Sequence, residues 1–147
     1  MTNNIKVEDL TPVKSMPLID VRKYEGKRAK IAIVEVVDDT TNYNKEGKWV
    51  EGLNRPVKKL RVATEILEVI KRDDSPDIEL RAEKKFSLKQ RKDGSWGWPD
   101  NEKSNLYKFM RRQKVSLPIE LKGTDVLLTT TPSKNPDDDR EWLDFLV

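Results

Sequence analysis

The stretch from Ile78 to Lys89 constrains the fold of this chain most, because apolar and polar side chains alternate along it. Successive side chains of a β-strand point to opposite faces, so a period of two predicts a strand with one buried face. Lys84 is the one charged residue on the apolar face, and we interpret it as a sign of an edge or a bend. The strand leads into a short loop that contains Trp96 and Trp98, and a loop of this length cannot bury both indoles.

Composition favours a single non-catalytic domain. The 147 residues are 35% hydrophobic and 37% charged, which is enough for one core beneath a strongly ionic surface. Without Cys or His the chain lacks disulfides, thiolate metal ligands and an imidazole base. Gly94 and Gly97 are not followed by the Lys-Ser/Thr of a nucleotide-binding loop. The aspartate pairs 38–39 and 73–74 lie in turn sequences, where local hydrogen bonding accounts for them. We therefore predict no enzymatic activity, no cofactor and no metal.

The sequence contains no apolar run of 18 residues and begins without an apolar signal segment. These two features predict a cytoplasmic protein with no membrane association.

Five strands and one helix are predicted, in the order strand, strand, strand, helix, strand, strand. Residues 1–16 are polar and predict a flexible lead-in to a single domain over residues 17–147. The helix begins after Ser104, a candidate N-cap, and carries an apolar stripe at i, i+3 and i+4. The long connection from Asp38 to about Pro56 is rich in turn formers and predicts a functional loop. The five predicted strands are Ala29–Val37, Val57–Ile70, Ile78–Lys89, Asp125–Thr131 and Glu141–Val147.

This order of elements resembles the OB-fold, over roughly residues 27–147 and at the level of topology only. The resemblance implies a mainly β fold, a five-stranded OB-like Greek-key barrel with one α-helix between strands 3 and 4. OB-folds bind oligonucleotides and oligosaccharides on the face of strands 2 and 3. Another small antiparallel barrel or an α+β sandwich is compatible with the same string of elements.

Basic residues gather in the middle of the chain, where residues 81–114 hold eleven Lys or Arg against four Asp or Glu, a net charge of +7. Single-strand binders combine such charge with aromatic side chains that stack on bases. We expect non-catalytic binding of single-stranded nucleic acid, DNA rather than RNA, with low sequence specificity and with replication or repair proteins as further partners. The residues expected to track phosphates are Lys59, Arg61, Arg81, Lys85 and Lys89. The residues expected to stack on bases are Tyr43, Trp49, Trp96 and Trp98.

Other interpretations remain open. The strand cations alternate with Glu65, Glu79 and Glu83, so cross-strand ion pairs could account for them without a ligand. The Trp96/Trp98 loop could instead anchor a protein partner in an assembly module, or stack on a glycan. Residues 137–145 resemble the acidic, aromatic-tipped tails with which bacterial and phage single-strand-binding proteins recruit partners. Their apolar content favours a closing strand, with Asp137–Asp139 in the last loop.

Overall fold

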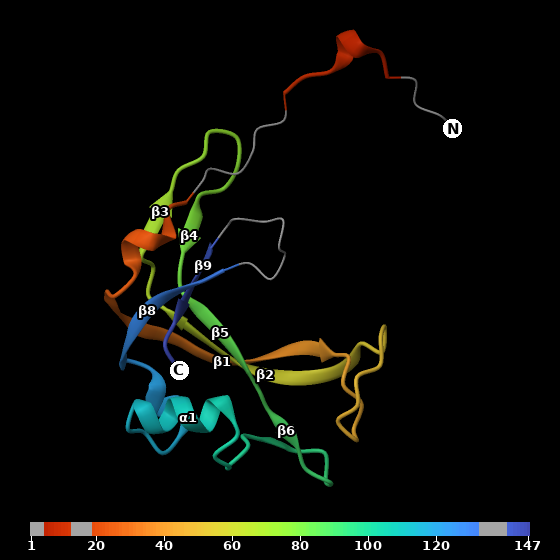
Figure 1. The fold of residues 1–147 in the computed structure, drawn as a ribbon, viewed down its shortest axis with the longest axis vertical. Coiled ribbons are helices and arrows are strands. Elements are labelled where there is room, and N and C mark those ends of the chain that lie inside the picture. The colour runs from red at the N-terminus through yellow and green to blue at the C-terminus, as the bar shows by residue number, and fades with distance from the viewer. Residues whose placement is uncertain (1–4, 13–18, 133–140) are drawn as a thin grey trace.

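The structure of this protein is a computed structural model, which describes residues 5–12, 19–132 and 141–147 (Figure 1). These residues form a mainly β fold with one α-helix, α1 (Asn105–Arg112). The strands are β1 (Arg28–Thr41), β2 (Arg55–Thr64), β3 (Glu68–Ile70), β4 (Ile78–Leu80), β5 (Glu83–Ser87), β6 (Lys89–Gln90), β7 (Trp96–Gly97), β8 (Asp125–Pro132) and β9 (Glu141–Phe145). Short 3-10 helices occupy η1 (Val7–Asp9), η2 (Val21–Tyr24) and η3 (Pro118–Leu121).

One antiparallel sheet carries the fold, with its strands in the order β5-β2-β1-β8-β9. The central strand β1 pairs with a different strand at each of its two ends. Its first residues, Arg28 to Lys30, pair with β8, and residues from Ile31 to Thr41 pair with β2. The register shifts between Ile31 and Ile33, which indicates a bulge. A bulge bends a strand and increases its twist, so β1 can serve both partners.

The predicted strands Val57–Ile70 and Ile78–Lys89 are each interrupted, which corrects the expectation of two long strands. Beyond Thr64 the chain leaves the sheet, and a separate hairpin of β3 and β4 follows. The hydroxyl group of Thr64 donates to the carbonyl of Glu65 and accepts from the backbone N–H of Ala82, both at 3.0 Å. Because one buried side chain joins the two segments, both break at the same level of the sheet.

The structure confirms the predicted helix and the last two predicted strands. The Ser104 hydroxyl caps α1 by accepting from the backbone N–H of Tyr107, and the stripe of Leu106, Phe109 and Met110 is buried. Strands β8 and β9 pair antiparallel from Leu128 opposite Phe145 to Pro132 opposite Glu141.

Two predictions fall wholly or partly outside the described residues. The acidic loop at Asp137–Asp139 is one of them. Of the predicted lead-in, residues 5–12 are described, and they expose Ile5, Val7 and Leu10.

The predicted closed barrel is not found, although the five-stranded antiparallel sheet is confirmed. In the described part of the chain, no backbone pairing joins the two edge strands, β5 and β9. Side chains link them instead. Lys84 Nζ lies 2.9 Å from Asp144 Oδ1, and Phe109 of α1 packs between Phe86 and Phe145 with ring centroids 5.4 and 5.3 Å apart. Lys84 therefore lies on an edge strand, as its place in the apolar pattern indicated.

Around these rings the core is continuous. Apolar residues of β1, β2, β8 and η3 pack against the helix and are nearly inaccessible to water. They include Ala29, Ile31, Leu60, Val62, Leu121, Val126 and Leu128.

Replacing Phe109 with alanine should lower the free energy of unfolding by about 3–5 kcal/mol, because a fully buried ring is lost and a cavity remains. Urea denaturation followed by circular dichroism measures the change. Ile119→Ala is the control, since that side chain is 64% exposed and its loss should cost less than about 0.5 kcal/mol. Equal costs for the two variants would contradict the central position of Phe109.

Candidate functional site

An aromatic pair stands on the loop between β1 and β2. Tyr43 and Trp49 face each other across an isolated antiparallel bridge, and their rings meet edge to face at 5.1 Å and 78°. Their exposed fractions are 51% and 60%. The rings stabilise each other, while much of their surface stays open to solvent.

Side-chain hydrogen bonds to the backbone shape this loop, whose ends are residues 42 and 54. Asn44 Oδ1 accepts from the backbone N–H groups of Glu46 and Lys48, at 3.0 and 2.8 Å. Arg55 Nε donates to the carbonyl of Tyr43 at 3.0 Å. Asparagine favours such turns because its short side chain reaches the backbone two residues on. The loop is shorter than predicted, since β1 continues to Thr41 and β2 starts at Arg55.

A second pair of aromatic residues lies on the hairpin of β6 and β7. Trp98 is 38% exposed and Trp96 is partly buried. The guanidinium group of Arg91 donates to the carbonyl of Trp96 at 3.1 Å and covers Gly97. A Cβ atom on Gly97 would approach Arg91 Nη2 to 2.6 Å, so glycine leaves room for the arginine to brace the hairpin.

The two aromatic loops emerge at the same end of β2. The first loop ends where β2 begins, at Arg55. The second loop follows Leu88, whose backbone N–H donates to the carbonyl of Lys58 on β2. Arg55 and Lys58 are three residues apart, which is about 10 Å along a strand. Figure 1 shows both loops on the side of the sheet remote from β3 and β4.

The predicted cations of the strand face are largely engaged in ion pairs. Register places Glu35, Arg61 and Lys85 in one row across three strands. Arg61 contacts Glu35 at 2.9 Å and Glu83 at 2.8 Å, and these hydrogen bonds raise the pKa of the guanidinium group. Of these two glutamates, sequence reasoning identified only Glu83.

Asp39 neutralises the lysines of the same face. Its carboxylate lies 3.3 Å from Lys59 Nζ and 4.0 Å from Lys85 Nζ. The backbone N–H of Thr40, and then Lys59, hold the pKa of Asp39 below its ordinary value. The sequence placed Asp39 in a turn, so its role on the strand was missed.

The remaining two predicted cations lie apart from this row. Arg81 donates to the carbonyl of Thr64 at 2.9 Å and lies 3.7 Å from Glu79. Lys89 is exposed on β6 and has no ion pair among the residues that the structure describes. The structure thus brings Lys59, Arg61 and Lys85 together and leaves Arg81 and Lys89 outside the group.

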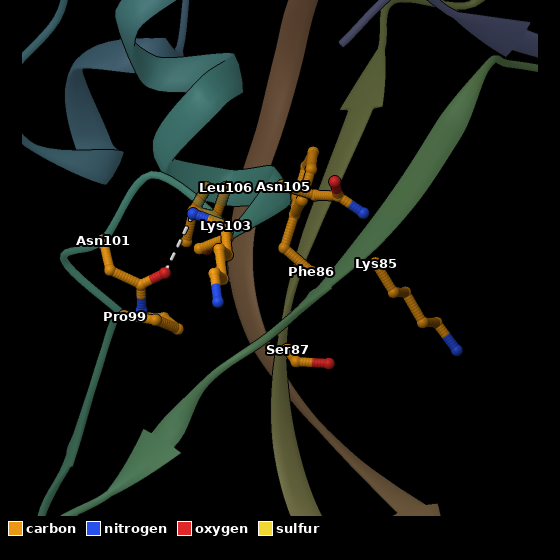
Figure 2. Close-up of a pocket in the computed structure, with 9 residues that line it drawn as sticks. Lys85, Phe86, Ser87, Pro99, Asn101, Lys103, Asn105 and Leu106 are labelled. Carbon is orange, nitrogen blue, oxygen red and sulfur yellow. Dashed lines mark hydrogen bonds between the residues drawn. The ribbon is translucent and has the colours of Figure 1, made fainter.

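A pocket of about 330 Å³ lies between β5 and the segment that leads into α1 (Figure 2). Three residues of β5, from Lys85 to Ser87, and six residues between Pro99 and Leu106 line it. Figure 2 shows the ammonium group of Lys103 extending toward the space between Pro99 and Ser87, whereas that of Lys85 points away. Sequence reasoning missed this pocket, because asparagine and serine before a helix are ordinary turn and cap residues.

Two further features are absent from the described residues. No group of three or more His, Cys, Asp or Glu side chains is arranged to hold a metal ion there. Nor is any helix in that part of the chain long and apolar enough to cross a membrane.

Comparison of the chain with protein-family models, curated protein sequences and solved structures finds no match.

Acid should remove the contribution of Asp39 to stability. A carboxyl with a lowered pKa stabilises the fold above its ordinary value of 3.8, and this stabilisation disappears as the pH falls toward the lower folded value. The difference in free energy of unfolding between the protein and Asp39→Asn should therefore be largest above about pH 5 and shrink toward about pH 3. Urea denaturation at several pH values measures it, and a difference independent of pH would contradict this account.

Proposed function

We propose that this protein binds single-stranded nucleic acid, DNA foremost, without catalysis. The observation that carries the proposal is the placement of the exposed aromatic rings of Tyr43, Trp49 and Trp98. They stand on two loops that emerge at one end of β2. Bases of any sequence can stack on such rings, and each stack contributes about 1–3 kcal/mol.

The strand order supports an OB-like arrangement. In that family, one helix lies between the third and fourth barrel strands, and α1 lies between β5 and β8, the third and fourth strands of the sheet along the chain. The side chains of Lys84 and Asp144 span the position where backbone pairing would close the barrel. The family's ligand face would then correspond to β2 and β5, with the loop at residues 42–54 at its border.

Electrostatic attraction would come mainly from cations outside the ion-paired strand face. Among the described residues, four exposed lysines near the aromatic loops have no carboxylate partner: Lys45, Lys48, Lys89 and Lys92. Each phosphate that a lysine neutralises adds about 0.7 to the slope of log affinity against log salt for a single strand. Binding should therefore depend moderately on salt, and stacking should supply much of the affinity.

A second candidate function is a protein-interaction or assembly module that uses the Trp96/Trp98 loop. The pairing of Arg61 with Glu35 and Glu83 favours it, because a neutralised face is poorly suited to phosphate. Recovery of a protein partner with the chain, combined with no response to oligonucleotides, would support this second candidate against the first.

Titration with oligo-dT should quench tryptophan fluorescence, and the affinity should fall as salt rises. Trp49→Ala should weaken binding about 5- to 150-fold, which corresponds to the loss of one stack. The control is Trp142→Ala, which removes another exposed indole, from β9, where Trp142 lies opposite Thr131 of β8 and outside both aromatic loops. Anisotropy of a labelled oligonucleotide measures all three proteins, and absence of binding at low salt would refute the proposal.

Releasing Arg61 from its carboxylates should tighten binding. The double variant Glu35→Gln/Glu83→Gln keeps the shape of both side chains and removes the charges that hold the guanidinium group. We expect higher affinity for oligo-dT and a salt slope steeper by about 0.7, the value for one additional phosphate contact. The matched control, Asp73→Asn/Asp74→Asn, makes the same change in net charge at the turn between β3 and β4. An equal gain in both double variants would show that net charge alone acts.

A further inference from the structure

Beyond its bulge, β1 has a backbone edge without a partner in the described part of the chain. Pairing with β8 and with the turn before it covers this edge only as far as Ile31. From Ile33 onward β1 pairs with β2 alone, and Figure 1 shows the two strands running out together toward the loop at residues 42–54. At the far end, the backbone N–H of Thr40 is bonded to the Asp39 carboxylate at 2.8 Å. The open edge therefore extends from Ile33 to Asp39.

The alternation of backbone groups along β2 shows which groups of this edge face outward. The N–H of Thr64 and the carbonyl of Lys58 bond to residues that flank β5, so the even-numbered residues of β2 face β5. Beyond the bulge, β1 and β2 pair even with even, and the even-numbered residues of β1 therefore face away from β2. Val34, Val36 and Asp38 thus present backbone donors and acceptors at alternate positions, as an added antiparallel strand requires.

The side chains of the open edge are those of an interior strand. Most of them are apolar and β-branched, and Val36 is 58% exposed although it lies opposite the buried Leu60. Proteins commonly protect an exposed edge with lysine or proline, and the segment from Ile33 to Asp39 contains neither. Another strand beside β1 would cover Val36 and satisfy the outward backbone groups.

We propose that this edge pairs antiparallel with the same edge of a second copy of the chain, with the two Val36 residues opposite each other at a two-fold axis. Because Val36 is the midpoint of the segment from Ile33 to Asp39, this register pairs the open edge along its full length. It also places every carboxylate of the segment opposite an apolar residue of the other copy. The resulting pairs are Glu35 with Val37, Asp38 with Val34, and Asp39 with Ile33.

Like-charge repulsion selects this register over its neighbours. A shift of two residues, the smallest that keeps the outward groups matched, puts Glu35 opposite Glu35 of the other copy or opposite its Asp39. The carboxylates also favour a second copy over a basic peptide. Glu35 is paired with Arg61 at 2.9 Å and Asp38 with Lys58 at 2.6 Å, so a cationic partner would have to displace these contacts.

Cysteine cross-linking tests the register, because the chain has no cysteine of its own. Val36→Cys should give a disulfide-linked dimer with oxidised glutathione, since Cα atoms of opposed residues in such a pair lie about 5.5 Å apart, within the range of a disulfide. Thr40→Cys is the matched control on the same strand. In the proposed register the two copies of position 40 lie about 27 Å apart and should not link. Non-reducing electrophoresis measures both variants.

Sedimentation equilibrium of the full chain tests the association itself. The protein should convert from monomer to dimer as its concentration rises, and Val36→Lys should weaken this association about fivefold or more by placing two ammonium groups opposite each other. Val69→Lys makes the same change at a valine of β3 that is 46% exposed, and it should leave the association unchanged.

Three results would overturn the inference. They are a monomer at near-millimolar concentration, a dimer that Val36→Lys does not weaken, and equal linking of Val36→Cys and Thr40→Cys. Linking of Val36→Cys alone, together with weaker association of Val36→Lys alone, would support it. Because neither measurement involves nucleic acid, the outcome is independent of the proposed function.

Discussion

The packing of Phe109 between Phe86 and Phe145 is the interaction on which the rest of the structure depends. The two edge strands that carry Phe86 and Phe145 have no backbone pairing with each other in the described residues, so α1 joins them through its one central ring. That ring fixes the distance from β5 to the helix, and this distance sets the walls of the pocket. Because β5 continues into β6, the same contact positions the hairpin that carries Trp98. Core packing and the candidate site therefore share one determinant.

The sequence predicted those elements whose signals are local. The alternation around Phe86, the Ser104 cap and the stripe that includes Phe109 each follow from spacing along a few residues, and the structure confirms the elements. The breaks in the two long strands could not be predicted in this way. They depend on the hydroxyl group of Thr64, which bonds to Ala82 eighteen positions later, and only the folded chain brings the two residues together.

In the candidate site, too, features with local sequence signals could be predicted and features that depend on long-range contacts could not. Exposure of Trp49 and Trp98 could be anticipated, because turn formers surround both and a short loop cannot bury them. The charges were harder to interpret, since the meaning of Arg61 depends on which carboxylates lie opposite. Glu35 reaches Arg61 through the register of β1 against β2, and register is set by the bulge and the turn rather than by composition. The strand face that its Lys and Arg residues suggested to be basic is thus a row of cations paired with carboxylates.

The strands of this sheet differ in how easily they open locally, because β5 and β9 contact each other through side chains and not through backbone pairing. The central strand β1 is held on both sides by backbone pairing, whereas β5 and β9 are each held on one. Local opening follows the weakest boundary, so amide protons along the outer margins of β5 and β9 exchange with solvent before those shared by β1 and β2. Separation of β5 from β9 would also part Phe109 from Phe86 or Phe145, so this boundary opens only at the expense of the core.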